Sequence, residues 1–354
     1  MTPEQIAEIL IHASKEFEMG LRRLNPIVLS GIREGLLIQL DPLAAARQFL
    51  LADKAGAMDE TVRSGLLRAC DFMFSAIRSF AGEADLQAAY ISALRAARKF
   101  CRAQEALFPL YRVFPEVNRY FLEPGASSAL ISAEKSQDVE TGIIHDGTSS
   151  HPHARGGYSL YIPETYTPEI AWPLVVALHG GYSHGRDFLW TWLRESRSRG
   201  FVLFAPTSQA MTWSIGNVAV DEQPLNRHLD QVCSCLHIDR ARILLTGMSD
   251  GGTFALAMGM SGNSFFNTIV PVSCALPPVD LQYAQGKRIL WVHGAQDWIF
   301  PVNWAARACK DLQQSGADIK LKVVDDLSHT YPREVNDTIL TWFGISGIRG
   351  ESKT

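Results

Sequence analysis

From about residue 156 onward, short apolar segments alternate with longer helical ones, and this alternation limits the fold more than any other feature. The apolar and β-branched runs have the length of strands; they are Tyr158–Ile162, Leu174–Leu178, Phe201–Phe204, Ile243–Thr246, Thr268–Val272, Ile289–Val292 and Leu321–Val324. Helical patterns separate most of them, near residues 186–199, 223–237, 250–260, 302–315 and 333–343. Strands that alternate with helices are typical of a mostly parallel sheet with helices on both faces. We therefore expect an α/β domain over residues 156–346.

The first 125 residues follow a helical period instead. Ile6, Ile9 and Leu10 begin this pattern, and further helical stretches cover about 42–55, 59–80 and 84–108. Asp59 or Thr61 is placed to cap the third of these four, since a short side-chain oxygen satisfies free N–H groups at a helix start. Turn-forming residues dominate the next segment of the chain. We predict an all-α N-terminal domain over 1–125 and a linker over 126–155.

The composition excludes several classes of protein. Of the 354 residues, 47% are hydrophobic and 20% charged, so the chain can bury a core and is not disordered. Its net charge of −4 leaves no excess of positive charge for a phosphate backbone. The start at Met1 has no basic segment typical of a signal peptide, and charges interrupt every long apolar run. We expect no membrane span, no nucleic-acid partner and a cytoplasmic location.

Cysteine and histidine spacing gives no clear metal site. The six cysteines include no C-x-x-C pair, and we expect free thiols. His145, His151 and His153 lie close together, but no acidic or cysteine partner follows at a tight spacing. A surface loop is the favoured interpretation of these histidines, so no metal and no cofactor are predicted.

A serine motif lies between a strand and a helix. Gly247-Met248-Ser249-Asp250-Gly251 is a G-x-S-x-G sequence that follows the run Ile243–Thr246. Such a turn holds the serine strained and exposed, and its glycines leave room for strand and helix to approach closely. The position between two elements strengthens a motif that is weak by itself. Ser249 is therefore the predicted nucleophile.

An upstream loop offers donors for a developing oxyanion. His179-Gly180-Gly181-Tyr182 follows the run Leu174–Leu178 directly, and glycines there let backbone amides point at an oxyanion. We expect the amide of Asp250 to be one donor and that of Gly181 or Tyr182 to be the other. The alternative interpretation is a tight strand-to-helix turn without a catalytic role.

An acid and a base follow later strands. Asp297 comes after Ile289–Val292, and His329 comes after Leu321–Val324. Parallel strands place their carboxyl ends at one edge, where open α/β sheets carry their sites. In this prediction His329 takes the proton of Ser249, while Asp297 fixes the imidazole tautomer and stabilises its charged form. Asp325 and Asp326 remain alternative acids, although they come close before the histidine.

Other candidates at strand ends favour structural roles. We expect the ring of His179 to brace the oxyanion loop, His293 to be structural and Cys274 to be a buried thiol. Three aromatic residues on loops at the strand ends are candidates for substrate contact: Tyr182, Trp213 and Trp298. For each of them, packing is an equally good interpretation. Trp190 and Trp192 lie in a predicted helix, and we expect them to pack in the core.

These four motifs, in this order, resemble the α/β-hydrolase superfamily. The phospholipase/carboxylesterase group is most similar, and the resemblance covers roughly residues 155–345. It implies an α/β-hydrolase fold and a serine esterase that needs no cofactor, with Ser249 as nucleophile, Asp297 as acid and His329 as base. The sequence departs from that group in its helical N-terminal segment. Three roles stay open for this segment: packing on the hydrolase, forming a wall over the site, or joining subunits in a homo-oligomer.

Three functions are weighed for this site. The leading hypothesis is a carboxylic ester hydrolase that works through an acyl-enzyme and takes a small-molecule ester. A prolyl-oligopeptidase-like serine peptidase shares the triad order, but its additional domain is typically a β-propeller rather than helices. A non-catalytic interaction protein on a hydrolase fold is the third hypothesis, although such proteins usually lose a triad residue.

Overall fold

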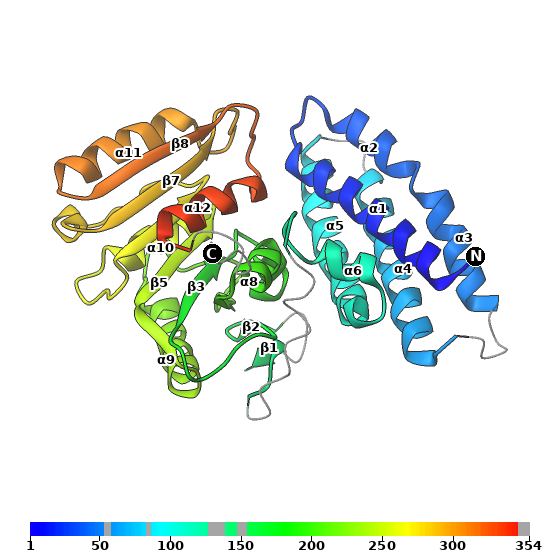
Figure 1. Cartoon of the computed structure of the whole chain (residues 1–354). Coiled ribbons are helices and arrows are strands. Elements are labelled where there is room, and N and C mark those ends of the chain that lie inside the picture. The colour runs from blue at the N-terminus through cyan, green and yellow to red at the C-terminus, as the bar shows by residue number, and fades with distance from the viewer. Residues whose placement is uncertain (53–57, 83–85, 127–138, 147–153, 346–354) are drawn as a thin grey trace. The chain divides into compact units, whose positions relative to one another are not determined.

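The computed structural model describes residues 1–52, 58–82, 86–126, 139–146 and 154–345, which divide into two compact units. One unit spans Met1–Pro124 and the other Gly125–Thr354. Figure 1 shows both units, with labels on many of their helices and strands. Of the helices in the described ranges, none has the length and apolar character needed to cross a membrane.

The first unit is helical throughout its described part, as predicted. Its elements are α1 (Pro3–Arg22), α2 (Leu29–Leu37), α3 (Leu40–Ala52), α4 (Glu60–Ala81), α5 (Leu86–Leu107), the 3-10 helix η1 (Phe108–Arg112) and α6 (Pro115–Tyr120). Asp59 caps α4, because its carboxylate accepts hydrogen bonds from the amides of Thr61 and Val62. Phe17 of α1 packs on Phe80 and Phe100, with ring centroids 5.7 and 4.9 Å apart, and this cluster lies in the core of the unit.

The second unit is built on an eight-stranded sheet in the order β1-β2-β4-β3-β5-β6-β7-β8. Its strands are β1 (Gly142–Asp146), β2 (Tyr158–Ile162), β3 (Trp172–Leu178), β4 (Val202–Pro206), β5 (Ile238–Met248), β6 (Thr268–Val272), β7 (Arg288–Gly294) and β8 (Asp318–Val324). β2 pairs antiparallel with both β1 and β4, and all the other pairs are parallel. The mostly parallel sheet of the prediction is thereby confirmed.

Helices connect and cover these strands. They are α7 (Gly185–Phe188), η4 (Leu189–Thr191), α8 (Leu193–Arg199), α9 (Ala219–Cys235), α10 (Asp250–Gly259), η5 (Leu281–Ala284), α11 (Val302–Gln314), η6 (Arg333–Val335) and α12 (Asn336–Phe343). Every residue of β2, β3, β4 and β6 is buried, which requires cover on both faces of the sheet. The single helix expected near 186–199 is divided into α7, η4 and α8.

Strand β1 lies inside the segment 126–155 that the sequence predicts to be a linker. Its register pairs Gly142 with Ile162 and Asp146 with Tyr158. The polar, turn-rich sequence around β1 does not predict a strand. The strand forms because it pairs with β2. The sequence of β2 alternates, a pattern typical of an exposed strand. It is nevertheless buried along its whole length, because both faces of the sheet are covered there.

Candidate active site

Ser249 occupies a strained turn between β5 and α10. Its φ of 55° lies in the left-handed region that side chains other than glycine rarely adopt. The turn needs its glycines: a β-carbon on Gly251 would lie 2.4 Å from the carbonyl oxygens of Leu178 and His179. The amide of Ser249 is fixed by a 2.9 Å bond to the carbonyl of Val272 on the neighbouring strand. The turn therefore presents the serine hydroxyl at the carboxyl edge of the sheet.

The predicted base lies beside this serine, and the predicted acid lies beside the base. His329, in the loop after β8, places Nε2 3.0 Å from the Ser249 hydroxyl oxygen. Its Nδ1 lies 2.9 Å from Oδ2 of Asp297, in the loop after β7. The side chains of His329 and Asp297 are 5% and 0% exposed, so little water screens their interaction. Residues 80 and 32 positions apart in sequence thus form one hydrogen-bonded chain.

The Asp297 carboxylate is oriented by its own loop. Its Oδ1 accepts hydrogen bonds from the amides of Ile299, at 3.0 Å, and Phe300, at 2.8 Å. This leaves Oδ2 for the imidazole. Asp325 and Asp326, the alternative acids, are exposed. The geometry therefore favours Asp297 over both.

The oxyanion loop lies against the nucleophile. A β-carbon on Gly180 would come within 3.7 Å of Cβ of Ser249. The amide of Asp250 begins α10, where first-turn N–H groups have no partner within the helix. The Tyr182 amide, however, donates to the carbonyl of Met211 at 2.8 Å. The sequence leaves Gly181 and Tyr182 as alternatives for the second oxyanion donor. Because the Tyr182 amide already donates to Met211, Gly181 and Asp250 remain the candidate donors.

The Asp250 side chain forms a contact that the sequence does not reveal. Its Oδ2 accepts a hydrogen bond from the Thr212 hydroxyl. The same oxygen would lie 2.6 Å from a β-carbon on Gly181. Asp250 thereby connects the oxyanion loop to the 208–214 loop. No local motif marks Thr212, because it reaches the site from a separate loop, 38 residues away.

Of the three aromatic candidates, two are exposed and one is buried. Tyr182 is 67% exposed and Trp298 50%, whereas Trp213 is only 3% exposed. Trp213 stacks on Phe254 at 4.9 Å and donates its indole N–H to the carbonyl of His179 at 2.7 Å. For Trp213 the sequence leaves substrate contact and packing as equally good interpretations. The structure favours packing, because Trp213 lies in the core against the loop that follows β3.

The other strand-end candidates have structural partners. His179 Nδ1 bonds the carbonyl of Gly180 at 2.7 Å, and its Nε2 accepts from the amide of Ser208 at 3.1 Å. Cys274 is buried, and burial raises the pKa of its thiol well above the usual value. It is therefore a neutral, unreactive thiol. Trp190 and Trp192 are buried, as expected for the core.

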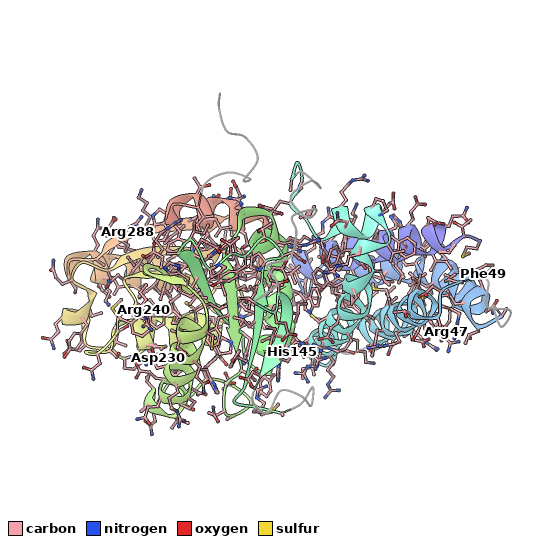
Figure 2. All side chains as sticks on the ribbon, turned by 60° about the horizontal axis from the view of Figure 1, so that its bottom comes forward. Arg47, Phe49, His145, Asp230, Arg240 and Arg288 are labelled. Carbon is pink, nitrogen blue, oxygen red and sulfur yellow. The ribbon has the colours of Figure 1, made fainter. Side chains whose placement is uncertain are left out.

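The histidines near the start of the second unit show no metal site in the described residues. His145, on β1 and labelled in Figure 2, bonds the Ser159 hydroxyl at 2.8 Å. His151 and His153 lie outside the described residues. Within the ranges that the structure covers, no three His, Cys, Asp or Glu side chains gather closely enough to hold a metal ion.

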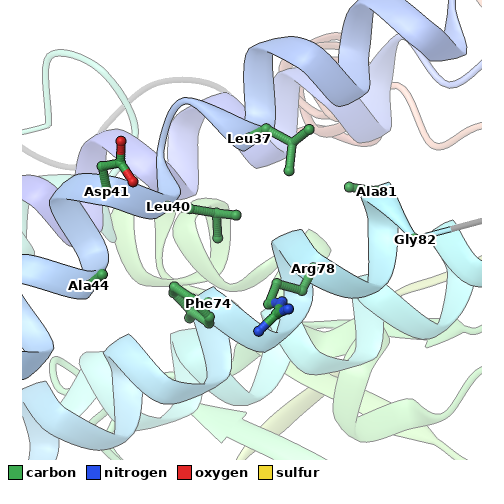
Figure 3. A pocket seen from close by; sticks show the side chains of 8 residues that line it. All are labelled: Leu37, Leu40, Asp41, Ala44, Phe74, Arg78, Ala81 and Gly82. Atoms are coloured by element: carbon green, nitrogen blue, oxygen red, sulfur yellow. The ribbon is translucent and has the colours of Figure 1, made fainter.

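An open groove of about 470 Å³ is lined entirely by residues of the helical unit. Figure 3 shows the side chains that line it: Leu37, Leu40, Asp41, Ala44, Phe74, Arg78, Ala81 and Gly82. The Arg78 guanidinium lies over the Phe74 ring, 5.7 Å from its centroid. The lining contains no serine, cysteine or histidine, so we place no hydrolytic chemistry there.

Strand order and serine turn together are those of the α/β-hydrolase fold, here preceded by a helical unit, with Ser249 in a strand-to-helix elbow. Residues 220–343 match the family model described as Phospholipase/Carboxylesterase, and this segment contains Ser249, Asp297 and His329. The match supports a hydrolase of the carboxylesterase type. A comparison with curated proteins found no match.

Several solved structures are similar to part of the chain. Esterase PE8 is 19% identical, with a TM-score of 0.43 over 52% of this chain and 97% of its own. Esterase 2 of Thermogutta terrifontis is 16% identical, with a TM-score of 0.46 over 59% and 97%. The acetyl xylan esterase from Aspergillus awamori is 14% identical, with a TM-score of 0.47 over 58% and 100%. The fold assignment rests on the strand order and the serine elbow, not on these similarities.

Proposed function

We propose that this protein is a serine carboxylic ester hydrolase that works through an acyl-enzyme intermediate. The observation that carries the proposal is the hydrogen-bonded chain from Ser249 through His329 to Asp297, with lengths of 3.0 and 2.9 Å. A nucleophile, a base within hydrogen-bond reach and an acid that orients the base are the parts that acyl transfer needs.

In the proposed reaction, His329 Nε2 takes the hydroxyl proton as Ser249 Oγ attacks the ester carbonyl carbon. The charge that develops on the carbonyl oxygen is stabilised by the amides of Gly181 and Asp250. His329 then gives its proton to the departing alcohol, and the acyl group stays on Ser249. Water, deprotonated by His329, attacks the acyl carbonyl carbon. As the bond to Ser249 Oγ breaks and the acid leaves, His329 returns the proton to that oxygen. Asp297 stabilises the imidazolium in both halves of the reaction.

Substrate contact is proposed for the two exposed aromatic residues. Tyr182 follows the oxyanion donor Gly181, and Trp298 follows the acid Asp297, so both stand beside reacting groups. Their exposure of 67% and 50% leaves apolar surface available to an acyl or aryl group. This supports a small-molecule ester as substrate. Every step uses the chain's own side chains, its backbone and water, so the mechanism requires no cofactor.

The proposal is tested by hydrolysis of p-nitrophenyl esters from acetate to palmitate, with Ser249→Ala measured alongside. We expect the variant to lose about 10⁴-fold or more in kcat, because the nucleophile and its base act as a unit. Ser234→Ala is the matched control, since Ser234 is exposed on α9 and bonds the carbonyl of Gln231. Turnover by Ser249→Ala at the wild-type rate contradicts the proposal.

The same proteins separate the rival functions. A fluorophosphonate probe labels an activated serine whatever the substrate is, so labelling of the wild type but not of Ser249→Ala excludes a non-catalytic interaction protein. Cleavage of peptide amides faster than of esters favours a peptidase instead. Against that rival, the described part of Met1–Pro124 is helical and contains no propeller blade.

A further inference from the structure

A second histidine lies beside the acid of the triad, and the proposed ester hydrolysis gives it no role. His293 is on β7, four residues before Asp297, and its side chain is fully buried. Its Nε2 lies 3.6 Å from Oδ2 of Asp297, the oxygen that bonds His329. That distance is too long for a hydrogen bond, so His293 contacts other partners.

The proton position on His293 follows from two independent partners. The indole N–H of Trp291 donates to Nδ1 at 3.2 Å, and because an indole nitrogen only donates, Nδ1 accepts and carries no proton. On the other side, Nε2 lies 2.7 Å from the carbonyl oxygen of Phe300, which only accepts. Both partners require the neutral ring with its proton on Nε2.

Phe300, whose carbonyl bonds His293 Nε2, contacts both the proposed acid and the proposed base. Its amide donates to Oδ1 of Asp297 at 2.8 Å. Its ring packs edge-on against the His329 ring, with centroids 5.5 Å apart. A shift of the Phe300 backbone would therefore move the carboxylate and the imidazole relative to each other.

We propose that His293, held by Trp291 as the neutral Nε2–H tautomer, is a positioning residue that fixes the acid loop through the Phe300 carbonyl. This inference rests on the proposed esterase function for its kinetic test but not for its structural one. His293 touches neither the substrate nor the serine in this proposal. Its effect reaches the reaction through the Asp297–His329 bond.

The charged form of His293 does not fit its surroundings. A proton on Nδ1 would oppose the Trp291 N–H, two donors 3.2 Å apart without water between them. Burial lowers the pKa of His293, and the charge on His329 acts in the same direction. The hydrogen bond to the Phe300 carbonyl and the Asp297 carboxylate both raise this pKa, but burial is the largest effect. Among the described residues, Asp297 and His329 are the titratable groups whose charges act on it, one from the loop after β7 and one from the loop after β8. These surroundings therefore favour the neutral form of the ring.

The kinetic test compares His293→Gln with His293→Leu. Glutamine retains a donor that reaches the Phe300 carbonyl, whereas leucine leaves that carbonyl without one. We expect kcat to fall about 10- to 100-fold in the leucine variant with KM within about twofold, because the Asp297–His329 bond strengthens when the imidazole gains its charge. Glutamine should restore most of the loss. The acid limb of kcat/KM should move to lower pH in the leucine variant, since a displaced carboxylate stabilises the imidazolium less.

His237→Leu is the matched control, because His237 also bonds a backbone carbonyl, that of Pro168 at 2.8 Å, before β5 begins. It should leave kcat and the pH profile unchanged. Wild-type kcat and pH profile in a folded His293→Leu protein would overturn the proposal. A uniform loss in both variants, with no shift of the acid limb, would also overturn it, since a merely structural histidine behaves that way.

A second measurement uses the wild-type protein alone, so it does not depend on whether a variant folds. Nitrogen-15 chemical shifts of the wild-type imidazoles distinguish the two neutral tautomers directly. We expect His293 to be Nε2-protonated from pH 6 to 8; a proton on Nδ1 would overturn the proposal. Because this readout does not use catalysis, it separates the two ideas. A wild type that fluorophosphonate does not label ends the esterase proposal and leaves the tautomer result standing.

Discussion

The carboxylate of Asp250 lies against the backbone of Gly181, so closely that a β-carbon on the glycine would come within 2.6 Å of Oδ2. The two residues supply the proposed oxyanion amides, and the carboxylate is itself held by the Thr212 hydroxyl. The spacing of the two donors therefore depends on a contact that only glycine permits.

The first prediction concerns this contact. Gly181→Ala should displace Asp250 or the loop and lower kcat by about 10- to 1,000-fold, the range found when one oxyanion donor is lost. Steady-state hydrolysis of p-nitrophenyl acetate measures the effect. Gly216→Ala is the control, since a β-carbon there meets no atom within 4 Å. Equal activity in the two variants would remove Gly181 from the site.

The second prediction concerns the acid. Asp297→Asn should retain acceptance from the Ile299 and Phe300 amides but present an NH₂ group to His329 Nδ1. The imidazole proton then moves to Nε2, which can no longer accept the serine proton. We expect kcat to fall by about 10⁴-fold, as in serine enzymes where this change has been made, with little loss of stability. Rate measurements together with thermal unfolding check both statements. Near-normal turnover would return the role to Asp325 or Asp326.

The third prediction separates the aromatic residues. Trp213→Phe removes the indole donor from the buried carbonyl of His179 and should lower the free energy of unfolding by about 1–3 kcal/mol. Trp298→Ala should change stability little, because the side chain is half exposed, and should alter the preference among acyl chain lengths. Urea unfolding and an ester series measure the two effects. An altered chain-length preference in Trp213→Phe alone would reverse these roles.

The fourth prediction is a pH dependence of stability. Burial lowers the pKa of His293 below the ordinary value of about 6.5, so the folded chain binds fewer protons than the unfolded one. The contribution of His293 to the free energy of unfolding is fully present at pH values above its pKa in the unfolded chain. It is lost as the pH falls from that value toward the pKa of His293 in the folded chain. The loss is at most about 1.4 kcal/mol per pH unit.

Urea unfolding between pH 5 and 8, followed by tryptophan fluorescence, measures this slope. His293→Gln removes the titrating group and should show a shallower slope over the same range. His237→Gln, an exposed position, should retain the wild-type slope. Identical slopes in all three proteins would mean that His293 titrates normally.

The sequence predicts the parts of this site that depend on strand ends. Ser249, Asp297 and His329 each follow an apolar run, and parallel strands bring their carboxyl ends to one edge whatever the loops do. The sheet and most of its helices are predictable as well, because the spacing of apolar residues within each element is a local feature of the sequence.

The features that the sequence does not predict depend on contacts between distant loops. The Tyr182 amide is occupied because the carbonyl of Met211 reaches it, and Trp213 is buried because Phe254 stacks on it. No pattern near Tyr182 or Trp213 encodes these partners. Strand β1 escapes prediction for a related reason, since its order comes from pairing with β2.

The strand order sets when the chemistry appears during folding. Ser249 follows β5, Asp297 follows β7 and His329 follows β8, with β6 between the first two in the sheet. The serine gains its base only after these four neighbouring strands have aligned, and long-range parallel pairing is slow to form. Recovered esterase activity would therefore report the completion of refolding, well after helical signals have returned. Under the proposed mechanism, a chain still being synthesised would stay inert until β8 has joined the sheet, and partly folded intermediates would carry no activated serine.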